Sequence, residues 1–364
     1  MIKNIIFHCP FVLNPKATSA SGIRPIKMLE AFKNLGFEVD VVSGPTSERK
    51  KIIKKILKDI NNGKEYDFVY SESSTMPTAL TDSHHLPLKP FLDFNFFKKL
   101  KSKNIPIGLF YRDIHWLFDH YGLGMHWYKK QLALFFYHFD LKNYNKYVDV
   151  LYLPSLGMGD FIKDKVSSEI FKELPPAHSI YFYEKTFSKK EKINLLYVGG
   201  IGKNYNIKKI FNVVKNHKNI SFTICTRESD WKQVEHEYGS IPENIKVVHK
   251  SGKDIKPLYK SADIGILFVE PKSYWTFAVP FKFYEYIGEN KPILSTKGTF
   301  VGNKVSKLDI GWALEYDEQC LNEFFENIYK YDLEEKFNNL LDIRSSETWK
   351  ARASQVAENL CGLK

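Results

Sequence analysis

Short apolar runs alternate with longer amphipathic stretches along this chain, and that alternation limits the possible folds more than any other feature. In the first half, strand-like runs occupy residues 4–8, 38–44, 67–72, 105–113 and 148–155. Helical patterns lie between them, for example residues 23–35, which stop at Gly36, a common helix terminator. Strands that are separated by helices pair in parallel through right-handed crossovers. The pattern therefore predicts an α/β fold with a parallel sheet.

The alternation breaks once and then restarts. Within the break, LPPAHSIYF (residues 174–182), two prolines end a helix, which is typical of an interdomain linker. Further strand-like runs follow at residues 193–200, 220–227, 244–250, 262–269 and 291–296. The length of 364 residues suits two α/β domains. We predict two Rossmann-like, doubly wound domains at residues 1–176 and 177–344, which face a ligand-binding cleft, and a terminal segment at residues 345–364.

The charge balance predicts an anionic partner. Lys and Arg number 53 against 42 Asp and Glu, which gives a net charge of +11. Nucleic acid, an anionic membrane face and phosphorylated substrates all satisfy such a charge. The four cysteines lie far apart, without the spacing of a zinc site or a disulfide framework, which fits a reducing, cytoplasmic setting. No run of 18 apolar residues is present, so we expect no membrane-spanning segment.

The most specific motif is VPFKFYEYIGENKPILST at residues 279–296. Lys282 and Glu285 are three residues apart, so a helix places them on one face. The N-terminus of that helix would offer unpaired N–H groups and a partial positive charge to a diphosphate. The alternative is a solvated surface ion pair between the two side chains.

This segment resembles the donor-site segment of GT-B glycosyltransferases, in particular the GT4 family, whose pattern is Pro-x-Lys-x-x-Glu-Tyr, then a small residue and Lys-Pro. The resemblance implies that Glu285 accepts hydrogen bonds from the ribose hydroxyls of a nucleotide sugar. It also implies that Lys282 offsets the charge of the leaving diphosphate. The remaining donor-site residues that it implies in this segment are Pro280, Phe281 and Tyr286.

A second stretch, LYVGGIGKNYN (residues 196–206), resembles the first strand and glycine turn of the donor domain in these enzymes. There Gly200 and Lys203 would lie beside phosphate, because glycine lets the backbone approach it closely. Retaining members carry an arginine after the glycine and a second glutamate eight residues before the ribose-binding one, where this chain has Phe277. Both departures argue against a retaining mechanism. Arg227, at a predicted strand end, is a candidate diphosphate or base contact, with a structural salt bridge as the alternative.

The first half offers candidates for the acceptor side. In FYRDIHW (residues 110–116), polar side chains crowd the end of a predicted strand, as in many bacterial GT-B enzymes of surface polysaccharide synthesis. An inverting transfer needs a general base, for which Asp113 is the first candidate and His115 the second. The alternative is that Asp113 caps the following helix. Further candidates for contact with donor phosphate or acceptor, unless they simply begin a helix, are Ser21, Gly22, Arg24 and Arg112.

Two segments mix lysines with aromatic residues, at residues 95–103 and 126–147. Such segments can lie on an anionic membrane surface, where aromatic rings enter the interface and lysines meet the headgroups. The alternative is a core helix whose lysines are merely solvated. The last predicted helix, residues 347–360, resembles the terminal helix of GT-B chains, which crosses back to the first domain.

Together these features predict a glycosyltransferase that moves a sugar from a nucleotide diphosphate sugar, with UDP favoured, and that needs neither metal nor cofactor. The expected acceptor is an undecaprenyl-diphosphate-linked glycan or polysaccharide in bacterial cell-surface glycan synthesis. The expected location is the cytoplasm, with peripheral attachment to the inner face of the cytoplasmic membrane. The alternatives are a nucleotide-sugar 2-epimerase on the same fold, a nucleic-acid-binding protein and an inactive GT-B scaffold.

Overall fold

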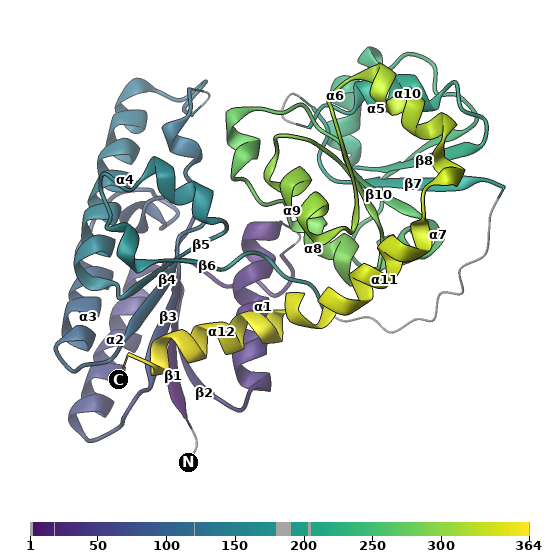
Figure 1. The fold of residues 1–364 in the computed structure, drawn as a ribbon. Coiled ribbons are helices and arrows are strands. Elements are labelled where there is room, and N and C mark those ends of the chain that lie inside the picture. Colours follow the sequence, from purple (N-terminus) through teal and green to yellow (C-terminus); the bar gives the residue numbers. More distant parts are fainter. Residues whose placement is uncertain (1–2, 18, 120, 180–190, 203–204, 364) are drawn as a thin grey trace. The chain divides into compact units, whose positions relative to one another are not determined.

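The computed structural model describes residues 3–17, 19–119, 121–179, 191–202 and 205–363. The chain forms two compact units (Figure 1). The first unit comprises Met1–Pro175 together with Trp349–Lys364, and the second comprises Pro176–Thr348. No helix in the described part of the chain has the length and apolar composition that crossing a bilayer requires.

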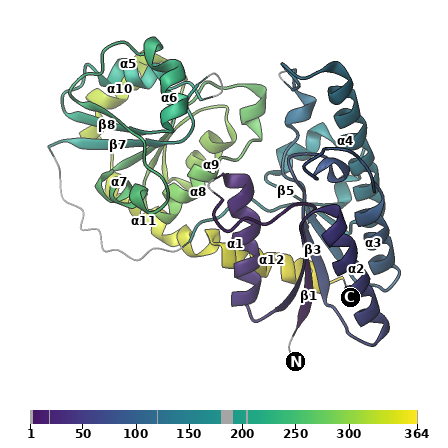
Figure 2. The ribbon, with the colours of Figure 1, turned by 180° about the vertical axis from the view of Figure 1, so that it is seen from behind.

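The first unit is built on a six-stranded parallel sheet in the order β2-β1-β3-β4-β5-β6. Its strands are β1 (Asn4–His8), β2 (Glu38–Val42), β3 (Phe68–Glu72), β4 (Ile107–Phe110), β5 (Val150–Leu153) and β6 (Phe171–Glu173). Its helices are α1 (Ala20–Asn34), α2 (Thr46–Asn61), α3 (Leu92–Lys101), α4 (Trp127–Tyr147) and α12 (Trp349–Cys361). Helices α1 and α12 pack together on one face of the sheet, and α2, α3 and α4 cover the other (Figure 2).

Burial on both faces explains why these strands are so apolar. All residues of β3, β4 and β5 are buried, including the polar Ser71 and Glu72 at the carboxyl end of β3. Gly108 in β4 lets α12 approach the sheet, because a Cβ atom there would lie 2.9 Å from a methyl carbon of Leu360. The terminal helix therefore belongs to the core of the first unit.

The second unit contains a six-stranded parallel sheet in the order β12-β11-β10-β7-β8-β9. Its strands are β7 (Ile193–Val198), β8 (Ile220–Cys225), β9 (Ile245–Val248), β10 (Ile264–Leu267), β11 (Ile293–Thr296) and β12 (Gly311–Leu314). Its helices are α5 (Lys208–Val214), α6 (Glu228–Val234), α7 (Lys256–Ser261), α8 (Phe281–Gly288), α9 (Phe300–Leu308), α10 (Glu318–Glu326) and α11 (Leu333–Arg344).

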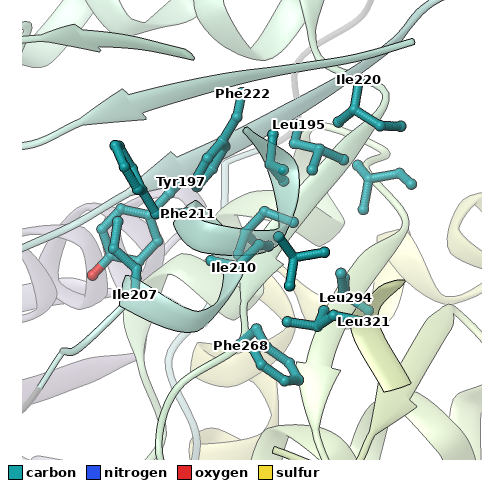
Figure 3. Packing of buried hydrophobic residues seen from close by; sticks show 14 of the residues in the cluster. Leu195, Tyr197, Ile207, Ile210, Phe211, Ile220, Phe222, Phe268, Leu294 and Leu321 are labelled. Carbon is teal, nitrogen blue, oxygen red and sulfur yellow. The ribbon is translucent and has the colours of Figure 1, made fainter. Parts of the chain in front are cut away.

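Alternating side chains divide the core of the second unit into two layers. Leu195 and Tyr197 of β7 join one cluster, together with residues of α5 and α10 (Figure 3). Leu196 and Val198 join the other, together with residues of α7, α8 and α9. Successive residues of a strand point to opposite faces, so β7 contributes to both layers.

Both sheets have a topological switch point, where the order of the strands reverses direction. It lies between β1 and β3 in the first unit and between β7 and β10 in the second. Ligands of doubly wound sheets bind beside the carboxyl ends of the strands at such points. The segments that follow β1, β3, β7 and β10 are therefore where each unit is expected to carry its chemistry.

Candidate functional site

Helix α8 follows the switch-point strand β10 and carries the most specific sequence motif. Pro280 precedes the helix in an extended conformation, and Phe281 is its first residue. Phe283, Tyr286 and their apolar neighbours are buried against the sheet. Lys282 and Glu285 lie on the opposite face and remain partly exposed, as their spacing of three residues predicts.

Tyr286 fixes α8 to the sheet and is completely buried. Its hydroxyl group accepts a hydrogen bond from the backbone N–H of Val198 at 3.1 Å and donates one to the carbonyl oxygen of Leu196 at 2.9 Å. Its ring lies against Gly265 of β10. The prediction that Tyr286 contacts the nucleotide sugar is therefore wrong: both hydrogen bonds of its hydroxyl are used inside the second unit.

The carboxylate of Glu285 has two partners within the second unit. Oε2 accepts a hydrogen bond from the hydroxyl of Tyr259 at 2.7 Å and forms an ion pair with the ammonium group of Lys282. Tyr259 belongs to α7 and is buried, and burial together with the charge of Glu285 raises its pKa well above the usual range. The sequence indicates the Lys282–Glu285 pair, but it does not reveal Tyr259 as its third member.

Other predicted donor-site residues follow neighbouring strands of this sheet. Gly200 follows β7, and its carbonyl oxygen accepts a hydrogen bond from the hydroxyl of Tyr197. Arg227 directly precedes α6 at the end of β8; its side chain is 72% exposed and pairs only loosely with Asp230, at 3.9 Å. Lys203 lies outside the described residues.

The charge of Lys282 also reaches the end of β8. It lowers the pKa of the Cys225 thiol, the last residue of that strand, although burial has the larger effect and raises this pKa overall. The carboxyl ends of β7, β8 and β10 thus gather Gly200, Arg227, Lys282 and Glu285 at one edge of the sheet.

In the first unit, two predicted phosphate or acceptor contacts are withdrawn from water. The guanidinium of Arg24 pairs with Glu72, donates to the carbonyl of Pro175 at 3.1 Å and lies 3.5 Å from the centre of the Phe110 ring. The side chain is only 2% exposed. Arg24 is therefore a core residue, and its prediction as a ligand contact is wrong because α1 turns that side chain inward.

Arg112 is nearly as enclosed as Arg24. It pairs with the second carboxylate oxygen of Glu72 at 3.1 Å and donates from Nε to the carbonyl of Ser73 at 3.1 Å. Burial lowers its pKa. In the sequence this cluster is indicated only by a glutamate at the end of a buried strand, and that glutamate is not among the predicted site residues. Ser21 and Gly22, by contrast, are half-exposed in the first turn of α1.

Asp113 and His115 follow β4 and are both partly exposed. Oδ1 of Asp113 accepts hydrogen bonds from the backbone N–H groups of Ile114 at 2.7 Å and His115 at 3.1 Å. Its other oxygen, Oδ2, lies 3.7 Å from Nδ1 of His115. One oxygen of Asp113 therefore binds the backbone of the turn that follows β4, while the other stays beside the imidazole. The capping position of that turn is Ile114, so the alternative interpretation of Asp113 as the cap is not confirmed. Within the described residues, no group of three or more His, Cys, Asp or Glu side chains could hold a metal ion.

Comparisons with known proteins define the fold. No family model matches this sequence, and no curated protein matches it. Among solved structures, HepE of Anabaena in complex with UDP and glucose has a TM-score of 0.60 at 13% identity, covering 99% of this chain and 100% of that chain. Sucrose-phosphate synthase of Thermosynechococcus elongatus has a TM-score of 0.65 at 12% identity, with 99% of both chains covered.

A third solved structure has a similar fold. WaaG, a glycosyltransferase involved in lipopolysaccharide biosynthesis, has a TM-score of 0.61 at 13% identity, covering 98% of this chain and 100% of that one. The likeness runs over nearly the whole chain in each case. The protein therefore has the GT-B fold, which confirms the predicted fold class of two Rossmann-like units.

Proposed function

We propose that this protein is a glycosyltransferase that takes its sugar from a UDP-sugar. The observation that carries the proposal is Glu285, a carboxylate at the switch point of the second sheet. One of its oxygens is held by Tyr259 and Lys282, while its side chain keeps access to solvent. A carboxylate in such a position can accept hydrogen bonds from two ribose hydroxyls. The complex of HepE with UDP and glucose, on the same fold, supports the choice of nucleotide.

The diphosphate would be met by positive charge rather than by a metal ion. Lys282 lies in the first turn of α8, whose N-terminus adds unpaired backbone N–H groups. Arg227 supplies a further cationic side chain at the neighbouring strand end. Fixed donors of this kind stabilise the charge that develops as a diphosphate leaves. We propose that the reaction uses these groups and no bound metal or cofactor.

Calorimetric titration with UDP, GDP, CMP and ADP tests the donor site directly. We expect UDP to bind the wild-type protein at micromolar levels, and Glu285→Ala to weaken it by about tenfold or more, which corresponds to ~1.4 kcal/mol. Glu323→Ala, which removes an exposed glutamate from α10, is the matched control and should bind UDP as the wild type does. Failure of every nucleotide to bind, or an unchanged affinity in Glu285→Ala, would contradict the proposal.

We further propose that the acceptor is lipid-linked and that the protein meets it at an anionic membrane surface. Helix α4 bears a row of apolar side chains at helical spacing, Tyr128, Leu132, Phe135 and Phe139, and the Phe139 ring contacts that of Phe91. Phe135 is 63% exposed. Exposed apolar residues also occur in the segments that precede α3 and α4 in the sequence and at the start of α4: Leu86, Leu88, Leu123, Met125 and Trp127. We call this set the α4 face.

The segment that carries most of these residues is basic. Residues 83–147 contain nine lysines and no glutamate. They contain four aspartates, of which Asp93 and Asp140 are buried. Exposed apolar side chains on a lysine-rich segment match the interface of an anionic bilayer, where rings enter the headgroup region and lysines meet lipid phosphates. An undecaprenyl-diphosphate-linked glycan is the acceptor class that such a location would supply.

Sedimentation with lipid vesicles tests this membrane proposal. We expect the protein to sediment with vesicles that contain anionic lipid and to stay in solution with neutral ones. Trp127→Ser combined with Phe135→Ser should abolish sedimentation without lowering UDP affinity. Leu341→Ser, an equally polar change at an exposed leucine of α11, is the control and should sediment normally. Equal sedimentation of the double variant and the wild type would refute the α4 face as the contact.

A further inference from the structure

The two partners of Glu285 differ in burial, although both contact the same oxygen atom: Tyr259 is buried and Lys282 is partly exposed. Oε2 accepts the hydrogen bond from Tyr259 and pairs with Lys282, whereas Oε1 has no hydrogen-bond partner within the described part of the chain. Lys282 reaches Oε2 with a flexible, partly exposed side chain from one turn away in the same helix. Tyr259 reaches it from another helix, α7.

Tyr259 is rigidly held within the second unit. Its side chain is buried, and its ring packs edge to face against Tyr286, with the ring centres 5.9 Å apart. Tyr286 is in turn hydrogen-bonded to the backbone of β7. Burial and the charge of Glu285 raise the pKa of Tyr259 well above its usual range, so its hydroxyl is protonated at neutral pH and donates to Oε2 of Glu285. Tyr259 is therefore a hydrogen-bond donor that packs against the sheet-bound Tyr286.

We propose that Tyr259 is a positioning residue for ribose recognition: it holds Oε2 of Glu285 so that Oε1 stays directed at the nucleoside. Lys282 is the exchangeable partner, which leaves Glu285 for the diphosphate when the donor binds. Tyr259 then remains as the protein group that orients the carboxylate. This inference rests on the proposed UDP-sugar site and assigns separate tasks to two residues that touch the same atom.

The separate tasks lead to separate binding defects. Without the Tyr259 hydroxyl, Glu285 loses its fixed orientation, and the ribose hydroxyls lose a well-placed acceptor. The loss of binding affinity is therefore larger for ligands that carry both hydroxyls, because a deoxynucleotide makes fewer hydrogen bonds to the carboxylate. Without the Lys282 ammonium, the diphosphate loses a favourable charge interaction. The resulting loss of binding affinity is the same for ribose and deoxyribose ligands.

Calorimetric titration of UDP and 2′-deoxy-UDP separates these effects. We expect the wild type to prefer UDP by about tenfold, the effect of a hydrogen bond to a charged group. Tyr259→Phe should reduce this preference to about twofold to threefold by weakening UDP alone, with an unchanged thermal unfolding midpoint. Lys282→Met should weaken both ligands equally and keep the tenfold preference. In a Glu285→Gln background, Tyr259→Phe should have no further effect on the preference.

Each contrary result has a distinct meaning. If wild-type protein binds neither nucleotide, the proposed donor site fails. If wild type prefers UDP and Tyr259→Phe keeps the full preference, or weakens both ligands equally, the positioning role is overturned while the donor site stands. If Tyr259→Phe folds poorly, Lys282→Met still decides, because loss of the preference in that variant would show that Lys282 and not Tyr259 orients the carboxylate.

Discussion

The Nε atom of Arg24 lies 3.2 Å from Oε1 of Glu72, and this ion pair joins helix α1 to the carboxyl end of β3 in the interior of the first unit. Arg112 takes the other carboxylate oxygen at 3.1 Å, and Tyr70 donates a hydrogen bond to Oε1 at 2.9 Å. The single buried carboxylate of Glu72 thus forms ion pairs with two guanidinium groups. Its charge fixes the position of α1 and of the turn that carries Asp113.

Removing that charge should destabilise the first unit strongly. Glu72→Gln keeps the size of the side chain but leaves two cations without a counterion, and breaking a buried pair in this way costs about 3–5 kcal/mol. We expect a corresponding fall in the free energy of unfolding, measured by urea titration of the full chain. Glu30→Gln breaks the exposed Lys27–Glu30 pair on the same helix and should change stability by less than about 1 kcal/mol. Equal losses in both variants would contradict the assigned role of Glu72.

Asp140 should make the protein less stable as the pH rises. Burial raises its pKa from the ordinary 3.8 to about 7, so between these values the folded state binds a proton that the unfolded state has released. The contribution of this group to the free energy of unfolding is therefore highest below pH 4 and falls as the pH rises toward 7. Above pH 7 the folded protein contains a buried, charged carboxylate and the destabilisation is complete. Oδ2 accepts the backbone N–H of Thr78 at 2.7 Å, an interaction that an asparagine side chain can keep.

Asp140→Asn should remove this dependence. We expect the variant to gain about 1–3 kcal/mol over the wild type at pH 8 and to gain nothing at pH 4, in urea unfolding at both values. Asp160→Asn changes an exposed aspartate of the same unit and serves as the control, with the same effect at both pH values. A stability difference between Asp140→Asn and wild type that does not vary with pH would rule out the buried carboxyl as its cause.

Gly265 should not tolerate a side chain, because it lies under the ring that anchors α8. A Cβ atom there would lie 2.6 Å from the Tyr286 ring, which its two hydrogen bonds to β7 prevent from moving aside. We expect Gly265→Ala to cost about 1–3 kcal/mol in urea unfolding, as overpacked core positions do. Gly200→Ala meets only the far end of Asp230, at 3.5 Å, and should leave stability nearly unchanged. Equal stability of the two variants would show that α8 can shift freely.

Periodicity and motif spacing predict much of this fold for a physical reason. Parallel strands that are buried on both faces must be apolar, so strands such as β3 and β10 stand out as short runs. The shared face of Lys282 and Glu285 is likewise confirmed, because a spacing of three residues fixes it in any helix. Both features are determined by residues that are close in the sequence, and such features can be predicted from sequence patterns.

The errors concern contacts between distant segments. Arg24 and Tyr286 carry groups that suit a ligand, yet α1 turns Arg24 toward Glu72, and α8 turns Tyr286 toward β7. The Tyr259–Glu285 hydrogen bond joins helices α7 and α8, which β10 separates in the sequence. No residue pattern within one segment determines which of its polar side chains finds a partner in another, and that choice separates a core residue from a ligand contact.

Asp113 can be tested as the general base without disturbing the hydrogen bonds that it accepts from the following turn. The side-chain oxygen of Asn accepts hydrogen bonds as a carboxylate oxygen does, so Asp113→Asn should keep the bonds to Ile114 and His115 while losing the proton-accepting carboxylate. We expect transfer of labelled sugar to a lipid extract to slow by about 100-fold to 10,000-fold, the usual contribution of a general base. UDP affinity and the thermal unfolding midpoint should stay at wild-type values. His115→Gln should slow transfer far less, because the imidazole stands beside the carboxylate and does not replace it. Wild-type transfer by Asp113→Asn, with a strong loss in His115→Gln, would make His115 the base and leave Asp113 as a residue that only orders the turn.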